Sequence, residues 1–204
     1  MSDLNSTELN ILKAAEDVFL EKGYTLAKTT EIAGKAGVTH AMLHYYYRTK
    51  EKIFLKIFEK KLHELVASLE MQLPKDIPFI EQVRLGVEAH FDFIASNPRI
   101  PRFLLQEVSD NADRTKEIRK LVEPVFVEML SEVTQRIERA VEAGEIRRVD
   151  PIHLLFDIAS LNVFVFLALP TLHKVIGLSK KEYKEFLEKR KAENVELILS
   201  RIRV

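Results

Sequence analysis

The 204-residue sequence contains no cysteine. Disulfides, thiolate zinc sites, iron–sulfur clusters and cysteine nucleophiles are therefore excluded together. The absence of cysteine suits the reducing cytosol. Hydrophobic residues make up 47% of the sequence and charged residues 30%, which is the composition of a globular protein rather than of a disordered or fibrous one.

The sequence also lacks an excess of one charge, an export signal and a long apolar run. Its 31 basic and 31 acidic side chains cancel, so any affinity for nucleic acid must come from local charge. The first residues, MSDLNSTELN, have neither the basic start nor the apolar core of a signal peptide. The most apolar stretch, Ile158–Leu169, is 12 residues long, whereas a membrane helix needs about 20. We expect a cytoplasmic protein that does not enter a membrane, and we interpret this stretch as a buried helix.

Strand-type alternation is absent, and apolar residues recur at intervals of three and four, which predicts an all-α fold. An apolar stripe through Phe19 predicts a first helix that Gly23 ends. Thr29, Thr39 and Thr49 are each expected to cap a further helix. The helix after the last of these threonines keeps its apolar spacing for about twenty residues, so it is expected to link two halves of the chain.

The second half of the sequence predicts further helices with clear boundaries. A stripe from about residue 80 ends at Asn97, because a residue before proline disfavours helix. Pro124 lies either near the start of a later helix or at a kink within it. Asp150 and the following proline cap a helix that extends to about Leu169 and is apolar on nearly all sides. One small bundle cannot cover such a helix, which predicts a homodimer.

Residues 29 to 54, TTEIAGKAGVTHAMLHYYYRTKEKIF, contain two short predicted helices separated by a turn at Gly37. This is the helix-turn-helix pattern, whose second helix enters the DNA major groove. The second helix carries hydrogen-bonding and stacking groups, and Lys50 at the start of the next helix can reach a phosphate. Between residues 28 and 50 there are four basic side chains and one acidic side chain, so the local charge is positive. We predict DNA binding through Thr39, His40, His44, Tyr45, Tyr46 and Lys50.

The sequences ILKAAEDVFLEKGY and TTEIAGKAGVTHAMLHYYYRTKEKIF resemble, in register and without gaps, the N-terminal domain of the tetracycline-repressor (TetR) family. The resemblance implies phosphate contacts from Thr29, Thr30 and Lys50. It also implies base or backbone contacts from the recognition helix, at Thr39, His40, Ala41, His44, Tyr45 and Tyr46. Two positions depart from the commonest pattern, since His44 stands where tyrosine is usual and Tyr47 where phenylalanine is usual.

Two later segments, HFDFIASNPRIPRFLLQE and GEIRRVDPIHL, are also similar to parts of family members. The resemblance implies a dimeric repressor whose helical bundle binds a ligand and dimerises through its last two long helices. The predicted domains are thus a three-helix DNA-binding domain over residues 1–52 and a ligand-binding and dimerisation domain over residues 53–204.

Several of these residues have a simpler interpretation that must be compared with DNA binding. Tyr47 lies four residues beyond Leu43 on the inner face of its helix, so we assign it to packing. His40 and His44 are spaced to hold a metal ion, but no third ligand with suitable spacing is near. We therefore favour DNA contact for both histidines and expect no metal site.

His90 and Asn162 are polar residues on the apolar faces of two predicted helices. Each either forms a hydrogen bond in the core or across a dimer interface, or orients a ligand, and both interpretations stay open. The nearby aromatic and methionine side chains either line a pocket or fill a solid core. No cluster of basic residues lies on the inward stripes, so the predicted ligand is small and mainly apolar or aromatic. The candidate ligand residues are His90, Phe91, Phe103, Phe126, Met129, Asn162 and Phe164.

The sequence has no G-x-S-x-G motif, no G-x-x-x-x-G-K phosphate loop and no dinucleotide fingerprint, which argues against an enzyme and against a cofactor. We predict a DNA-binding transcriptional regulator, a repressor, that binds a palindromic operator as a homodimer and is released by its ligand. The alternative is a helical small-molecule or partner-binding module whose helix-turn-helix no longer binds DNA. The neutral net charge leaves this alternative open.

Overall fold

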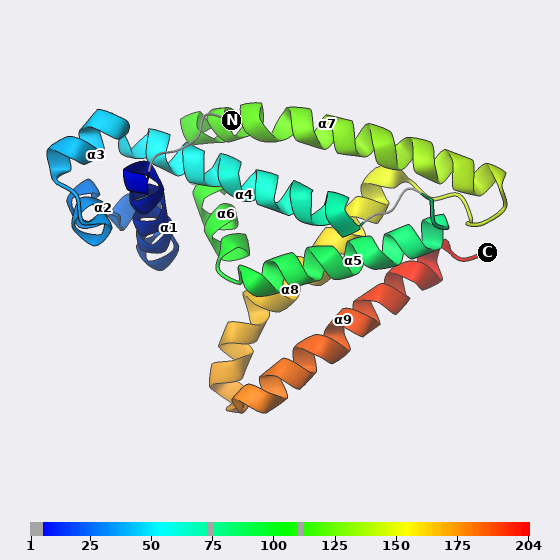
Figure 1. The fold of residues 1–204 in the computed structure, drawn as a ribbon. Helices are drawn as coiled ribbons and strands as arrows, with labels where there is room; N and C mark the ends of the chain where they lie inside the picture. The colour runs from blue at the N-terminus through cyan, green and yellow to red at the C-terminus, as the bar shows by residue number, and fades with distance from the viewer. Residues whose placement is uncertain (1–5, 73–75, 110–111) are drawn as a thin grey trace. The chain divides into compact units, whose positions relative to one another are not determined.

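The structure, a computed structural model, describes residues 6–72, 76–109 and 112–204 (Figure 1). Every named element within these ranges is an α-helix, so the predicted all-α fold is confirmed. The helices of the described ranges are α1 (Ser6–Leu26), α2 (Thr29–Ala36), α3 (His40–Tyr46), α4 (Lys50–Gln72), α5 (Phe79–Ser96), α6 (Ile100–Ser109), α7 (Ala112–Glu142), α8 (Pro151–Ile176) and α9 (Lys180–Ile202).

The helices form two compact units, each with its own apolar core. The first unit comprises Met1–His63 and Arg102–Val122, and the second comprises Glu64–Pro101 and Glu123–Val204. Both α4 and α7 begin in the first unit and end in the second. The first unit therefore includes more of the chain than the predicted domain of residues 1–52, because later residues of α4 and α7 contribute to its core.

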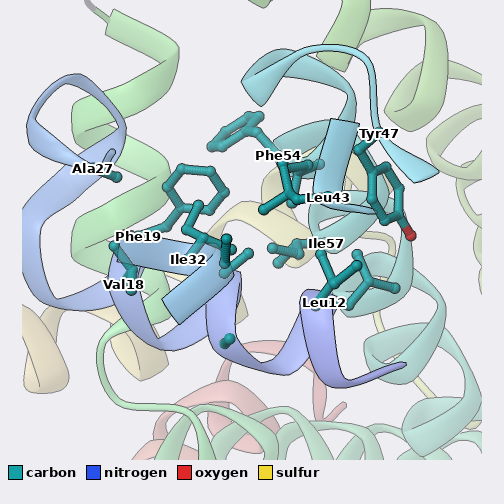
Figure 2. Close-up of a cluster of buried hydrophobic side chains, with 14 of the residues drawn as sticks. Leu12, Val18, Phe19, Ala27, Ile32, Leu43, Tyr47, Phe54 and Ile57 are labelled. Carbon is teal, nitrogen blue, oxygen red and sulfur yellow. The ribbon is translucent and has the colours of Figure 1, made fainter. Parts of the chain in front are cut away.

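The core of the first unit is built around α1 (Figure 2). The rings of Phe19 and Phe54 meet edge to face with their centroids 5.9 Å apart, and Ile118 of α7 joins the same cluster. Gly23 has a φ of 75° and a ψ of 168°, so it kinks α1, but the helix continues to Leu26 instead of ending at Gly23 as predicted. The buried residues of this core include Ile11, Leu12, Ala15, Val18, Phe19, Ile32, Leu43, Tyr47, Ile53, Phe54 and Ile57.

Most of the predicted helix boundaries of the first unit are confirmed. Gly37 ends α2 with a φ of 68°. The Thr39 hydroxyl accepts a hydrogen bond from the Met42 N–H at 3.1 Å, and Thr49 caps α4 in the same way. The prediction that Thr29 caps α2 is wrong, because Thr29 is the first helical residue and Lys28 precedes it without a side-chain cap.

In the second unit, α5 packs against both α8 and α9. Asp150 caps α8 by accepting the His153 N–H at 3.0 Å, and α9 begins with a capping box between Ser179 and Glu182. Pro124, whose place the sequence left open, lies inside α7. The two buried clusters of this unit include Phe79, Val83, Val87, Leu154, Ile198 and Ile202 in one, and Phe91, Ile94, Val165, Phe166 and Leu169 in the other.

Helix α8 is longer and more exposed than the sequence predicts. It passes Leu169 and ends at Gly177, because Pro170 removes one backbone donor without stopping the helix, whereas Gly177 adopts a left-handed conformation. By length and composition α8 could cross a membrane, and only 28% of its most apolar segment is buried within the described part of the chain. Within Ile158–Leu169, the stretch interpreted as a buried helix, Asn162, Val165, Phe166 and Leu169 are buried, whereas Phe164 is 67% exposed in the single chain.

Candidate nucleic-acid interface and ligand site

Helix α3 is held by its inner face and presents polar groups on its outer face. Leu43 is completely buried, and Tyr47 is 6% exposed, which confirms that Tyr47 is a packing residue. Its hydroxyl donates a hydrogen bond to Glu8 at 3.0 Å, and burial raises the pKa of Tyr47. The outer side chains form what we call the recognition face, which consists of Thr39, His40, Ala41, His44 and Tyr45, all exposed.

Side chains of the recognition face form edge-to-face ring pairs and a polar contact with α2. The rings of His40 and His44 meet edge to face with their centroids 4.4 Å apart, and those of Tyr45 and Tyr46 do so at 5.4 Å. His40 Nε2 also lies 3.0 Å from the Thr29 hydroxyl, so the start of α2 is linked to the start of α3. The structure therefore gathers the predicted recognition residues on one surface, with Thr29 and Tyr46 half-buried at its edge and Thr30 exposed.

Lys50 is anchored within the first unit, although the sequence suggested only a phosphate contact. Its ammonium group donates to the carbonyl oxygens of Tyr24 and Ala27 at 2.8 and 3.0 Å. It also lies 4.2 Å from the centroid of the Tyr24 ring. Lys50 thus ties the end of α1 to the start of α4, and its contact with DNA stays a prediction.

A cluster that the sequence did not predict lies next to Lys50. The Tyr24 hydroxyl donates to Glu51 at 2.6 Å, and Arg114 of α7 approaches both residues. Burial, together with the hydrogen bond to Glu51, raises the pKa of Tyr24 to about 12. No local motif could reveal this cluster, because Arg114 is 63 positions from Glu51 and follows no pattern shared with it.

In the second unit, a buried chain of polar side chains joins α5, α8 and α9. Asn162 and Asn194 are both completely buried. The Asn162 amide nitrogen donates to the Val87 carbonyl at 2.9 Å and lies 3.2 Å from His90 Nδ1. Asn194 donates to the Leu161 carbonyl at 3.1 Å and to Asn162 Oδ1 at 2.9 Å. Sequence reasoning selected His90 and Asn162 but missed Asn194 of α9, whose partner Asn162 is 32 positions away.

The two backbone carbonyls determine how this chain is oriented. A carbonyl can only accept, so the amide nitrogens of Asn162 and Asn194 face the carbonyls. The second hydrogen of the Asn162 amide then points to His90 Nδ1, which must accept it and carries no proton. The neutral imidazole of His90 therefore has its proton on Nε2. Burial lowers the pKa of His90 to about 4, in keeping with this neutral form.

The other candidate ligand residues do not converge on His90. Phe91 is 2% exposed and packs against Phe166, so it belongs to the core. Phe103 lies in the first unit, where the centroid of its ring is 5.4 Å from that of the Phe54 ring. Phe126 and Phe164 are 40% and 67% exposed, and Met129 is half-buried. Their role in ligand binding stays a prediction.

A cavity of about 290 Å³ opens between the start of α5 and the end of α7, within the second unit. Phe79 forms part of its apolar wall, and Arg136 and Arg139 contribute positive charge. Glu132 and Glu145 line the same cavity, so two carboxylates balance the two guanidinium groups. The Glu145 carboxylate also accepts the Ile80 N–H at 2.8 Å, which stabilises the N-terminus of α5. Within the described ranges, no group of three histidine, aspartate or glutamate side chains is placed to hold a metal ion.

A glycine turn followed by a short helix that is anchored inside and polar outside defines a helix-turn-helix DNA-binding protein. Residues 11–57 match the family model "Bacterial regulatory proteins, tetR family", and residues 80–198 match "Tetracyclin repressor-like, C-terminal domain". The chain belongs to the TetR family of bacterial regulatory proteins. It is a DNA-binding transcriptional regulator and not an enzyme.

Individual relatives are distant but extend over much of the chain. The fatty acid metabolism regulator protein of Bacillus subtilis (strain 168) is 22% identical over 139 residues, which is 68% of this chain and 70% of the relative. The HTH-type transcriptional regulator RutR of Escherichia coli (strain K12) is 27% identical over 198 residues, 93% of this chain and 86% of the relative. The structure of the Bacillus subtilis regulator FadR in complex with stearoyl-CoA matches with a TM-score of 0.73 at 20% identity, covering 94% of this chain and 97% of that one. This structural match shows that the fold is shared.

Proposed function

We propose that this regulator is a cytoplasmic repressor that binds a palindromic operator as a homodimer and is released by an acyl ligand. The recognition face carries the proposal, because its polar groups are exposed while Leu43 and Tyr47 anchor the helix. Bases are read by such groups in the major groove, and phosphate contacts from Thr29, Thr30 and Lys50 would set the register.

The homodimer is supported by the exposed stripe of α8. Ile152, Phe156 and Phe164 are 51%, 70% and 67% exposed, and they follow one face of the helix at multiples of four residues. Phe186 and Leu197 of α9 are also exposed. Apolar patches of this kind mark association sites, and a stable dimer would bury on the order of 2,000 Å² in total. A two-fold dimer matches an operator with two-fold symmetry, whose half-sites lie about one DNA turn or a multiple of it apart.

The ligand class is supported by the second unit and by the relatives. A mainly apolar effector is what the sequence predicts, and a fatty acid metabolism regulator and a structure with stearoyl-CoA are among the similar proteins. His90 has a neutral Nε2–H donor in the direction opposite to Asn162, which suits the carbonyl oxygen of a thioester or a carboxylic acid. The alternative function is a helical ligand-binding module that does not bind DNA.

Selection of a duplex from a random-sequence pool by the full-length chain tests the proposal. We expect an enriched palindrome, bound by two chains, whose affinity falls when stearoyl-CoA is added. A coupling of roughly 1 to 3 kcal/mol corresponds to a loss of about 5- to 150-fold. Stearate and free coenzyme A, added separately, distinguish recognition of the acyl chain from recognition of the nucleotide.

Each part of the proposal can fail by itself. If no duplex is enriched, the DNA-independent module becomes the better description. An enriched sequence without two-fold symmetry would contradict the dimeric operator. A palindrome whose affinity is insensitive to stearoyl-CoA and to stearate would exclude the acyl ligand. Transcription from a promoter that carries the selected site shows whether the protein is a repressor or an activator, since a repressor lowers transcription.

A further inference from the structure

Arg114 is a charged residue buried in the first unit, where a surface position would be usual for its type. It lies in the first turn of α7 and is 5% exposed. Its guanidinium carbon lies 3.6 Å from the centroid of Tyr24 and 5.2 Å from that of Phe54, and Nε donates to Glu51 at 3.3 Å. A buried guanidinium is stable only with such partners. We call this group, Tyr24, Glu51, Phe54 and Arg114, the arginine cluster.

The arginine cluster adjoins the contacts of Lys50. The Tyr24 hydroxyl donates a hydrogen bond to Glu51, the residue after Lys50. The backbone carbonyl of Tyr24 accepts a hydrogen bond from the Lys50 ammonium group. The Lys50 ammonium group also approaches the Tyr24 ring. The position of Tyr24 thus sets both the end of α1 and the start of α4. Arg114 covers the ring of Tyr24 and pairs with Glu51. It therefore stabilises the contacts of Tyr24 with both Glu51 and Lys50.

The residue that completes this arrangement lies outside the helix-turn-helix segment. The N-terminal family model matches residues 11–57, whereas Arg114 comes from α7 together with Ile118, one turn later and 6% exposed. Helix α7 continues to Glu142, and Pro124 lies two residues after Val122, the last residue of the first unit. An internal proline removes a helical hydrogen bond and makes this point of α7 the easiest to bend.

We propose that Arg114 is a positioning residue for DNA binding, which fixes Tyr24 and Glu51 so that Lys50 and the start of α4 are held in the arrangement that meets phosphate. The proposal rests on the DNA-binding function and does not depend on the acyl ligand. Withdrawal of Arg114 would leave the Glu51 carboxylate with the Tyr24 hydroxyl alone and would empty the space beside the Tyr24 and Phe54 rings.

The test compares Arg114→Met with a matched control in the full-length chain. Methionine keeps the apolar volume of the arginine stem but removes the charge and the planar group. Lys120→Met is the control, because Lys120 lies on the same helix, its side chain is 69% exposed, and it pairs with Glu117 one turn away. Binding to the selected palindromic duplex is measured over a range of salt concentrations, and amide exchange is measured without DNA.

The dependence of affinity on salt separates positioning from general stability. The salt slope counts the cations that neutralise phosphate, and Arg114 is too buried to be one of them. We expect Arg114→Met to lower affinity by about tenfold and to reduce the salt slope by about one, because Lys50 is displaced. In a Lys50→Ala background, Arg114→Met should reduce the slope no further. Lys120→Met should leave affinity and slope unchanged.

Amide exchange supplies a readout that needs no DNA. Arg114→Met should speed exchange at residues 24–27 and 50–54 at least about tenfold while exchange in α9 stays unchanged. Faster exchange throughout the first unit with an unchanged salt slope would show that Arg114 only stabilises the fold, and would overturn the proposal. An unchanged exchange rate at these residues would also overturn it. If the wild-type chain selects no duplex, the DNA-binding function fails, and the exchange result still decides whether Arg114 holds these residues.

Discussion

The first unit keeps its phenylalanine rings inside, whereas α8 of the second unit presents two of its own to solvent. Phe19 and Phe54 are at most 1% exposed, while Phe156 and Phe164 are 70% and 67% exposed. The difference lies in what covers each helix. Helix α1 is enclosed by α2, α3, α4 and residues of α7, whereas α8 packs mainly against α5 and α9 and leaves Phe156 and Phe164 exposed. The core of the first unit is closed within one chain, whereas the exposed face of α8 in the second unit would be covered in the proposed homodimer.

The largest expected effect tests this difference with one substitution in each unit. Phe19→Ala should lower the free energy of unfolding by about 3 to 5 kcal/mol, because it removes a ring from a closed core. Phe164→Ala should change the unfolding of a dilute monomer by less than about 0.5 kcal/mol. Its effect should instead appear as weaker dimerisation in sedimentation experiments. Equal losses of unfolding free energy for both variants would contradict the comparison.

The second expected effect concerns pH, and it belongs to the polar interior of the second unit. The pKa of His90 is lowered from 6.5 to about 4, so the unfolded chain binds a proton at a pH where the folded chain does not. The contribution of neutral His90 to the free energy of unfolding is therefore fully present above pH 6.5. It decreases as the pH falls and is lost near pH 4, a difference of about 3 kcal/mol.

Denaturant unfolding between pH 7 and 4 measures this loss. His90→Gln, which cannot titrate, should flatten the curve over this range relative to wild type. A variant curve parallel to that of wild type would show that other groups cause the pH dependence.

The smallest expected effect distinguishes contact with DNA bases from contact with phosphates in the first unit. His40→Ala should weaken binding to the selected operator by about 1 to 3 kcal/mol and leave binding to random duplex nearly unchanged. His40 also contacts Thr29, and Thr29→Val, which removes this contact together with the proposed phosphate contact of Thr29, should weaken operator and random duplex alike. Uniform weakening on all duplexes would reassign His40 to phosphate or scaffold contact. Base reading would then pass to Thr39, His44 or Tyr45.

The parts of the fold that follow local rules could be predicted from the sequence. The caps at Thr39 and Asp150 depend on residues within one helical turn, and both were predicted correctly. The inner position of Tyr47 follows from its spacing to Leu43. These features need no knowledge of the tertiary structure.

Other features depend on contacts between distant residues. Arg114 meets Glu51 across 63 positions, and Asn194 meets Asn162 across 32, so no window of sequence contains either pair. The predicted end of α8 near Leu169 is the end of the most apolar stretch, whereas the helix continues past Pro170 to the cap at Gly177. The anchoring of Lys50 was missed because the sequence around a lysine at the start of a helix does not show whether its ammonium group faces a phosphate or a backbone carbonyl.

The exposed stripe of α8 links the stability of this regulator to its abundance. If a second copy covers Ile152, Phe156 and Phe164, only the associated chain gains the free energy of their burial. The melting temperature should then rise with protein concentration, and a newly made chain is at its least stable before it meets a partner. A cell that holds few copies of the protein would have a larger fraction of it dissociated, and dissociated chains bind one half-site at a time. In the proposed dimer, the amount of the regulator would therefore be a second control on DNA occupancy, beside the proposed effector.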